Sequence, residues 1–471
     1  MRPTRSAVLI IGLVLLLAPS TAHAAHGLDL GFFDGVYRED SATRDLWLDR
    51  TVAVDANFVR LEIGWPAPDT ATRPPSFNAR DPSDTHYDFA RADAAIVAAS
   101  SRGLQVLAGF TGAPRWADGA GRPASVTPGT WKPSPKALEE YGAALARRYS
   151  GSFPDPARPG QFLPKVKAFQ VWNEPNLSKY LNPQWKGKRT AAPAIYRAML
   201  TAFYRGVKSV STSPLVVSAG TAPFGDAQAG GKRIMPARFV REMLCLRSKR
   251  GRLATSTCPA PARFDVLAHH PYSVGRPRRK ALNTDDVSIP DIGKLTRVLR
   301  FAERKKRALP HKRHPMWVTE TSYDSNPPDP HGVALATQAR WLEEAFYLLW
   351  RQGIDTITWF QVRDQMPIPT YDATNQSGVF FNGGASKPSA VAFRFPFVAE
   401  RAGANRLRVW GRSPQAGNVT IERFRAGTWR TVRSLPVQRN ATFLVRIAAA
   451  PRPDRLRARV AGETSLTWTQ R

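Results

Sequence analysis

The sequence predicts a (β/α)8 TIM barrel, an α/β fold, followed by a small all-β sandwich. Two observations predict this architecture. From Leu28 onward, short apolar runs alternate with stretches of helical period, and the alternation repeats eight times. Near Arg401 the pattern changes to short runs of period two with turn residues between them. We therefore expect a barrel over residues 25–400 and a β-sandwich over residues 401–471.

The eight apolar runs are the expected barrel strands. Each run has four to seven residues, a length typical of strands. The runs are Leu28–Phe33, Phe58–Ile63, Leu104–Phe110, Val166–Trp172, Pro214–Ala219, Phe264–Ala268, Met316–Thr319 and Asp355–Gln361. An open doubly wound sheet would usually carry a glycine-rich phosphate turn after the first strand, and Gly31-Phe-Phe-Asp-Gly35 is not such a turn. The absence of that turn favours the closed barrel.

Amphipathic stretches between the strands are the expected helices. In the first of them, apolar residues recur at Phe89, Ala92, Ile96 and Val97, which is a helical spacing. The expected helices are Phe89–Ser101, Pro135–Tyr149, Ala194–Val210, Ile292–Arg307 and Val333–Arg351. After the barrel, six short runs predict the sandwich: Arg406–Trp410, Val419–Phe424, Trp429–Leu435, Phe443–Ile447, Leu456–Val460 and Ser465–Trp468.

The N-terminal segment of residues 1–24 predicts a signal peptide. Arg2 and Arg5 form a basic start, Ala7–Ala18 is an apolar stretch too short to span a bilayer, and Ala22-His23-Ala24 suits a signal peptidase. We therefore expect a secreted protein without an integral membrane segment. In an oxidising compartment, Cys245 and Cys258 are expected to form a local disulfide rather than a zinc site.

The composition is strongly basic, with a formal net charge of +31. Such a field attracts anionic partners, among which an acidic polysaccharide remains open, although scattered arginines on solvated faces are the simpler interpretation. The sequence has no zinc-finger spacing, no aromatic RNA-binding motif and no basic region followed by heptads. Nucleic acid is therefore not an expected partner. We also expect the protein to be a monomer.

Several polar side chains stand where the expected strands end. In a parallel barrel the C-terminal ends of the strands form the reactive face. The second strand carries Arg60, the fourth ends in Asn173 and Glu174, and the sixth is followed by His270 and Tyr272. Pro175 cannot continue a strand, so Glu174 lies at the tip of the fourth. The seventh strand delivers Glu320 and the eighth delivers Trp359.

Two of these side chains are carboxylates on opposite sides of the expected ring. One protonated and one ionised carboxyl group are the equipment for cleaving a glycosidic bond. If Arg60 and Tyr272 converge on Glu320, they favour its ionised form, and Glu320 is the nucleophile. Burial and repulsion would then keep Glu174 protonated as the acid.

Three points stay open at this level. Glu62 follows Arg60 on the same face of the strand and is an alternative structural partner for it. Asp324 is a rival to Glu320 as the carboxylate after the seventh strand. Asp364 could bind substrate hydroxyls or pair with Arg363.

The strand-end residues resemble those of the clan A glycoside hydrolases. Trp172-Asn-Glu-Pro-Asn176 looks like the acid/base motif of that clan, and Trp317-Val-Thr-Glu320 looks like its nucleophile strand. Within the clan, Ala113-Pro-Arg-Trp-Ala117 is more similar to family 39 than to family 5. The resemblance covers residues 28–397.

The resemblance implies a retaining mechanism. Two carboxylates complete a double displacement by themselves, so no metal and no organic cofactor is expected. The resemblance also implies that Asn173 binds the 2-hydroxyl of the sugar, that Trp359 forms the floor of the −1 subsite, and that Arg60 and Tyr272 belong to the site. His270 is a candidate site residue as the neighbour of Tyr272. The sequence therefore predicts a retaining O-glycoside hydrolase acting on a poly- or oligosaccharide. A transglycosylase on the same residues and a non-catalytic carbohydrate-binding barrel are the alternatives, and neither the sugar nor endo or exo action follows from the sequence.

Overall fold

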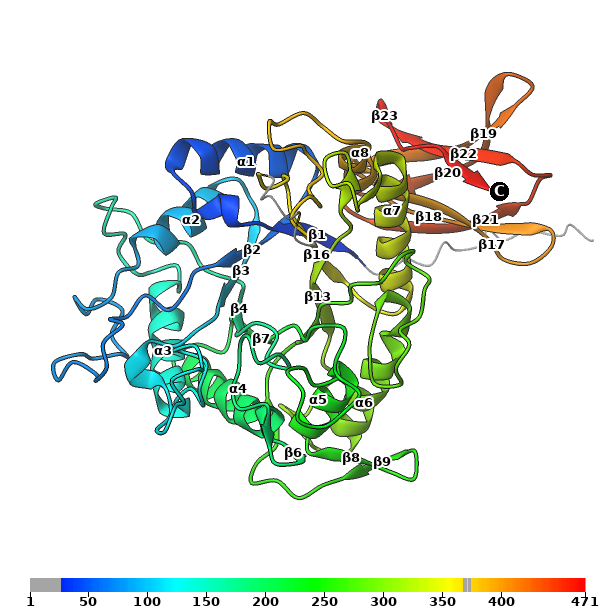
Figure 1. Ribbon diagram of the computed structural model, residues 1–471. Coiled ribbons are helices and arrows are strands. Elements are labelled where there is room, and N and C mark those ends of the chain that lie inside the picture. The colour runs from blue at the N-terminus through cyan, green and yellow to red at the C-terminus, as the bar shows by residue number, and fades with distance from the viewer. Residues whose placement is uncertain (1–26, 367–370, 372–373, 471) are drawn as a thin grey trace, which may run out of the picture.

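Eight parallel strands form the barrel in the computed structural model, which describes residues 27–366, 371 and 374–470. The expected signal peptide lies outside the described residues. Around the ring the strands are β1 (Asp29–Phe33), β2 (Phe58–Glu62), β3 (Gln105–Phe110), β4 (Ala168–Val171), β7 (Leu215–Ser218), β11 (Leu267–His269), β13 (Met316–Thr321) and β16 (Thr356–Phe360). Parallel bridges Val217–Val266 and Thr221–His269 close the ring between β7 and β11. Each expected strand is present, and the predicted barrel is confirmed (Figure 1).

Helices surround the barrel. They are α1 (Ser41–Ala53), α2 (Ala90–Ser101), α3 (Pro135–Arg148), α4 (Ala192–Lys208), α5 (Pro236–Met243), α6 (Gly293–Arg304), α7 (Leu335–Arg351) and α8 (Pro388–Arg394). Five correspond to the expected helices. The other three, α1, α5 and α8, were not predicted, because α5 and α8 are short and α1 is rich in charged residues.

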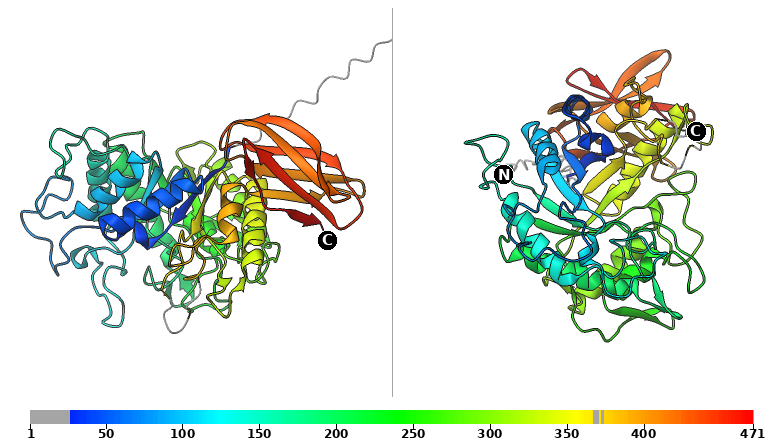
Figure 2. Two further views of the ribbon diagram at one scale, coloured as in Figure 1. Left: turned by 90° about the horizontal axis from the view of Figure 1, so that it is seen from above. Right: turned by 60° about the vertical axis from the view of Figure 1, so that its left-hand side comes forward.

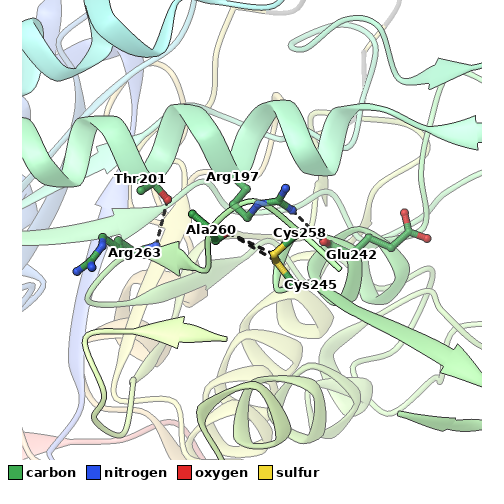
Figure 3. Close-up of a disulfide and its surroundings, with 7 residues drawn as sticks. All are labelled: Arg197, Thr201, Glu242, Cys245, Cys258, Ala260 and Arg263. Atoms are coloured by element: carbon green, nitrogen blue, oxygen red, sulfur yellow. Dashed lines mark hydrogen bonds between the residues drawn. A yellow bond between two sulfur atoms is a disulfide. The ribbon is translucent and has the colours of Figure 1, made fainter. Parts of the chain in front are cut away.

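Short elements decorate the loops. Single 3-10 turns cover Gly35–Arg38, Arg115–Ala117 and Ile289–Asp291. Short strands pair as β5 (Trp185–Lys186) with β6 (Arg189–Thr190), β8 (Leu246–Lys249) with β9 (Arg252–Thr255), β10 (Ala262–Arg263) with β12 (Ala308–Leu309), and β14 (Ser325–Asn326) with β15 (Val333–Ala334). The β8–β9 hairpin is framed by the predicted disulfide, which is confirmed: Cys245 and Cys258 are bonded, with Cα atoms 5.9 Å apart (Figure 3).

The interior of the barrel is layered, and the layering positions the site. The lower part of the interior is an apolar cluster formed by Phe58, Leu107, Ala168, Val217, Val266, Ala268 and Trp317. Because side chains alternate along a strand, residues two positions further on face the same interior one layer higher. Those residues include Arg60, Gln170, His270 and Thr319, which are all buried. The second layer is therefore polar, and it lies directly under the mouth of the barrel.

An antiparallel all-β region follows the barrel, as predicted. One sheet contains β17 (Phe397–Arg401), β18 (Arg406–Arg412) and β21 (Thr442–Ala448). The other contains β19 (Gly417–Arg425), β20 (Thr428–Val437), β22 (Asp454–Val460), β23 (Glu463–Thr464) and β24 (Trp468–Gln470).

Two details of this region differ from the expectation. The strand β17 was not predicted. The expected strand Ser465–Trp468 is wrong, because the Ser465 hydroxyl binds the backbone of Ala458 and splits the run into β23 and β24.

A buried ion pair joins the barrel to the β-region. The Arg412 guanidinium donates to the Leu28 carbonyl at 3.0 Å and lies 3.1 Å from Asp55 Oδ2. Trp410 packs against Tyr347 of α7, with ring centroids 5.6 Å apart. The two parts therefore share one continuous core, and the β-region lies against the side of the barrel that carries α7 and α8 (Figures 1 and 2). Within the described residues, none of the helices has the length and apolar character needed to cross a membrane.

Candidate active site

The ends of four strands bring six predicted residues into one cluster. Arg60 comes from β2, Asn173 and Glu174 follow β4, and Glu320 lies on β13. His270 and Tyr272 follow β11 and reach the same cluster through hydrogen bonds to Glu174 and Glu320. One predicted residue, Trp359, does not join it.

The two predicted carboxylates face each other across the mouth. One oxygen of Glu174 and one of Glu320 lie within 4.8 Å of each other, and each side chain is 13% exposed. The tight turn after β4 helps to set this distance. Trp172 and Glu174 both have positive φ angles, 78° and 36°, and the Glu174 amide donates to the Gly220 carbonyl at 3.1 Å. Such backbone conformations are costly for non-glycine residues and concentrate at functional sites.

Both oxygens of Glu320 accept hydrogen bonds. Arg60 Nη1 donates to Oε2 at 3.2 Å, and the Tyr272 hydroxyl donates to Oε1 at 2.8 Å. The Arg60 side chain is only 1% exposed, so its charge acts on Glu320 with little screening by solvent. Two donors, one of them cationic, thus hold this carboxylate in a fixed orientation with strong hydrogen bonds.

Glu174 lies in a different environment. Burial raises the pKa of Glu174 to about 7, although the positive charges of Arg60 and Lys179 oppose the shift. Among the described side chains, Glu174 forms a hydrogen bond with the neutral ring of His270, whose Nδ1 lies 3.0 Å from Oε1. Near neutral pH the Glu174 side chain is therefore protonated in a large share of the molecules. Glu320, in contrast, is paired with the buried Arg60.

A chain of hydrogen bonds fixes the proton on His270. Burial lowers the pKa of His270 to about 3, so the ring is neutral. Gln170 Nε2 donates to both the Ser218 carbonyl and the Thr319 hydroxyl at 3.0 Å. The Thr319 hydroxyl lies 3.0 Å from His270 Nε2, and Arg60 Nη1, which can only donate, lies 3.4 Å from the same nitrogen, so Nε2 is the acceptor.

The remaining ring proton of His270 therefore lies on Nδ1 and is donated to Glu174 Oε1. With Oε1 occupied as an acceptor, the acidic proton of Glu174 is directed to Oε2. Gly220 allows this arrangement, because a Cβ atom at that position would lie 2.0 Å from His270 Nε2.

Asn173 is oriented by the same arginine. Arg60 Nη2 donates to Asn173 Oδ1 at 2.9 Å, which settles which end of the amide is oxygen. The amide nitrogen makes no hydrogen bond to any residue in the described part of the chain. It is therefore free to donate to a ligand beside Glu174.

The prediction for Trp359 is wrong. Its side chain is completely buried, its Nε1 donates to the Ser377 carbonyl at 2.8 Å, and its ring packs against Phe346 of α7. The aromatic side chain that faces the mouth is the next residue, Phe360, which is partly exposed. Its ring lies 5.5 Å from that of Phe33, which in turn lies 4.0 Å from the Arg60 guanidinium carbon.

The three open alternatives are resolved by the contacts. The ion pair of Arg60 is with Glu320, and Glu62 forms no ion pair among residues 27–366 or the other described positions. Asp324 accepts from the backbone amides of Thr374 and Gln376 and so holds a loop. Asp364 is buried and pairs with Lys387 rather than with Arg363: its Oδ1 accepts from the buried Lys387 ammonium at 2.6 Å.

The aromatic residues after the other strands divide into two groups. Trp65 and Tyr323 are buried, and Trp65 stacks on Tyr141 with centroids 4.7 Å apart. Trp116, Tyr180 and Trp185 remain partly exposed.

A metal ion could be considered at this site, because Glu174, His270 and Glu320 each offer one ligand atom within 4.8 Å of the others. However, Arg60 places a positive charge 3.2 Å from the same Glu320 oxygen. His270 Nδ1 carries the proton that a metal would have to displace. These residues are therefore better suited to proton transfer than to holding a cation.

Comparisons with known proteins agree with this fold. No protein-family model and no curated protein matches the sequence. Among solved structures, a family 39 glycoside hydrolase from the gut symbiont Bacteroides cellulosilyticus WH2 is similar, with a TM-score of 0.53 and 16% identity over 90% of this chain and 82% of that chain. A glucosidase from Croceicoccus marinus has a TM-score of 0.51 and 14% identity over 91% of this chain and 97% of that chain.

At these identities the likeness establishes the fold. The chain shares the barrel fold of these two solved structures, and the resemblance predicted from the strand-end motifs is confirmed as a likeness of fold.

Proposed function

We propose that the protein is a retaining O-glycoside hydrolase that acts on a poly- or oligosaccharide. The observation that carries this proposal is the pair of carboxylates, Glu174 and Glu320, with oxygens within 4.8 Å and unequal partners. Retaining enzymes place their two carboxyl groups about 5 to 5.5 Å apart, whereas inverting enzymes need about 6.5 to 9.5 Å to admit a water molecule. The distance therefore supports double displacement. The names of the two structural neighbours agree with glycosidase activity.

In the first step, a Glu320 oxygen attacks the anomeric carbon of the sugar. The bond from that carbon to the leaving oxygen breaks, and Glu174 transfers its proton to the leaving oxygen. In the second step, ionised Glu174 takes a proton from water. The water oxygen then attacks the anomeric carbon, the bond to Glu320 breaks, and both carboxyl groups return to their starting states. No cofactor is needed for this cycle.

The neighbours of the two glutamates are proposed to prepare these steps. Arg60 and Tyr272 hold both oxygens of Glu320 in place for attack. His270 keeps the acidic proton of Glu174 on Oε2. Asn173, whose amide nitrogen is free beside the acid, is proposed to donate to the 2-hydroxyl of the sugar. Phe360 takes the place that the sequence assigned to Trp359, as the aromatic face of the −1 subsite.

The test is a hydrolysis screen against a panel of glycans and aryl glycosides, followed by labelling with the matching 2-deoxy-2-fluoro glycoside. We expect one sugar class to be cleaved with retention of configuration, and peptide mass analysis to find the label on Glu320. Both Glu174→Gln and Glu320→Gln should lose turnover on the natural linkage. Sugar binding without cleavage or label would support a non-catalytic barrel, and transfer to added sugars in preference to water would support a transglycosylase.

We also propose that the protein is exported after removal of residues 1–24. The basic, apolar and small-residue segments of the N-terminus support this, and the disulfide between Cys245 and Cys258 fits an oxidising compartment. Sequencing the N-terminus of protein recovered from the culture medium tests this proposal. A cell-retained protein that begins at Met1 would contradict it.

A further inference from the structure

The positive charge of the chain is concentrated in the β-region. Residues 401–471 contain 15 basic and 3 acidic residues, a net charge of +12 out of +31 for the whole chain. All 15 basic residues are arginine, whereas 16 of the 53 basic residues before them are lysine (68 − 15 = 53). Arginine differs from lysine in presenting a planar fork that matches carboxylates and phosphates in two-point contacts. The bias therefore favours a recognition role over simple solubility.

Five residues form what we call the arginine face of the β-region: Phe424, Trp429, Arg455, Arg457 and Arg459. The three arginines alternate along β22 with Leu456, Ala458 and Val460, which are buried. The arginines therefore lie together on the outer surface of the five-stranded sheet. Phe424 and Trp429 are directly paired on the neighbouring strands β19 and β20, with ring centroids 5.3 Å apart.

The aromatic rings of the arginine face support the guanidinium groups. The Arg455 Cζ atom lies 4.5 Å from the Phe424 centroid, and the Arg457 Cζ atom lies 4.1 Å from the Trp429 centroid. Rings covered in this way offer little face for stacking a sugar or a base. They hold the guanidinium planes in place and so reduce the entropy lost when a ligand binds.

The arginine face has little negative charge of its own. Glu422 is its one carboxylate, 2.7 Å from Arg457 and 3.7 Å from Arg459. The Arg455 side chain forms no ion pair or hydrogen bond with another residue in the described part of the chain, and its contacts are with the rings of Phe424 and Trp429. Three aligned cations thus share a single carboxylate, and the surface is complementary to a chain of anionic groups.

We infer that the arginine face binds a polysaccharide that carries carboxylate groups and so holds the barrel on an anionic polymer. The rigid guanidinium forks favour two-point contacts with oxyanions such as carboxylates. The choice of a glycan rests on the proposed function of the barrel. Binding by this face is separate from catalysis, because none of its residues belongs to the cluster around Glu174 and Glu320.

The experiment compares two soluble polymers with the same backbone, carboxymethylcellulose and hydroxyethylcellulose. Dissociation constants are measured by calorimetry on the full chain carrying Glu320→Ala, so that hydrolysis plays no part and a failure of the proposed function does not affect the result. We expect binding to the carboxylated polymer only, weakening as salt is added. The triple variant R455A/R457A/R459A should bind about tenfold more weakly.

A charge-matched control is R406A/R446A/R452A, which removes three exposed arginines elsewhere in the β-region and should bind like the parent. Thermal melting checks that both triple variants are folded. Equal losses in the two triple variants would overturn the inference, because they would show attraction by net charge alone. Equal affinity for the two polymers would also overturn it, as would tighter binding to dextran sulfate, duplex DNA or phosphatidylserine vesicles at the same salt concentration.

Discussion

Two buried arginines, Arg60 and Arg412, show how the same ion pair serves two different purposes. Each guanidinium is almost fully buried and pairs with one carboxylate at 3.1–3.2 Å. Their carboxylate partners differ. Glu320, the partner of Arg60, is 13% exposed and faces the mouth of the barrel, whereas Asp55, the partner of Arg412, is 2% exposed.

The difference lies in what the carboxylate can still reach. Glu320 keeps access to a ligand, so the charge of Arg60 is available to act on chemistry. Asp55 is closed in by Arg412 and by Arg439, so its charge is used only within the fold. Removing Arg412 leaves the buried Asp55 to the more exposed Arg439, a weaker compensation for its charge. The comparison therefore predicts loss of stability at one arginine and loss of activity at the other.

The largest expected effect is on stability, from Arg412→Met. This change leaves Asp55 and the Leu28 carbonyl without their buried partner, and we expect the free energy of unfolding to fall by about 3 to 5 kcal/mol. Denaturant titration measures it. The matched control is Arg439→Met, which touches the same carboxylate from an exposed position and should cost less than about 1 kcal/mol. Similar losses in both variants would contradict the distinction between closed and open pairs.

The second effect is on activity, from Arg60→Met. Glu320 would keep only the Tyr272 hydroxyl, and Asn173 would lose its orienting donor. We expect kcat/KM to fall by about 10²- to 10³-fold, the usual cost of losing one preorganised donor. Steady-state kinetics on the best aryl glycoside from the screen provides the measurement. An active Arg60→Met enzyme would show that the pair at the mouth is structural.

A third way to sharpen the comparison disturbs the site without touching a charged residue. In Gly220→Ala the new Cβ would overlap the His270 ring, which must then move away from Glu174. Since general acid catalysis is worth about 10²- to 10⁴-fold, we expect a fall in kcat of about 10²-fold. Gly293→Ala is the matched control, because a Cβ at Gly293 meets nothing within 4 Å. Unchanged kcat in Gly220→Ala would remove His270 from the mechanism.

These residues also show how far the sequence could predict the molecule. The eight barrel strands were predictable because they are short, apolar and regularly spaced. Glu174 and Glu320 could be proposed because each closes a strand in a recognisable motif. Gly220, Gln170 and Thr319 were missed, because their importance comes from contacts between strands: Gly220 and Thr319 contact His270, and Gln170 contacts Thr319. Thr319 could have been found, since it lies two residues after the buried Trp317 and so faces the same interior.

The choice between Trp359 and Phe360 could not be made from the sequence. Strands of a parallel barrel are buried on both faces, so hydrophobicity alone does not distinguish the inner face of β16 from the outer one. Thr356 and Thr358 lie on the same face as Phe360, but a buried threonine fits either face, so the alternation did not decide between the two aromatic side chains. Helix α7 settles the question, because Phe346 covers Trp359 from outside the barrel.

The next smaller effect is a fall in kcat/KM of about tenfold per pH unit at alkaline pH. Glu174 must be protonated to act as the acid, and its pKa is raised to about 7 by burial. We therefore expect kcat/KM to fall as the pH rises above about 7. His270, with its pKa lowered to about 3, is neutral throughout this range and does not contribute. A pH profile measured with an alkyl glycoside tests this.

The control for the pH profile is an aryl glycoside whose leaving group departs without protonation. With this substrate, the rate of the first step should not fall at alkaline pH. That rate is measured as the release of the fluorescent aglycone in single-turnover experiments. An alkaline fall of equal size with both substrates would assign the titration to a group other than Glu174.

The smallest effect concerns the aromatic platform at the mouth. Phe360→Ala removes a partly exposed ring beside Phe33, and a lost aromatic contact of about 1 kcal/mol should raise KM roughly five- to tenfold. Trp359→Phe, one residue earlier, should leave KM unchanged and lower only the melting temperature, because that ring faces α7. A change in KM thus identifies the side chain on the inner face of β16, and a change in melting temperature alone identifies the side chain on its outer face. A raised KM in Trp359→Phe, with none in Phe360→Ala, would reverse the orientation of the strand end and return Trp359 to the sugar.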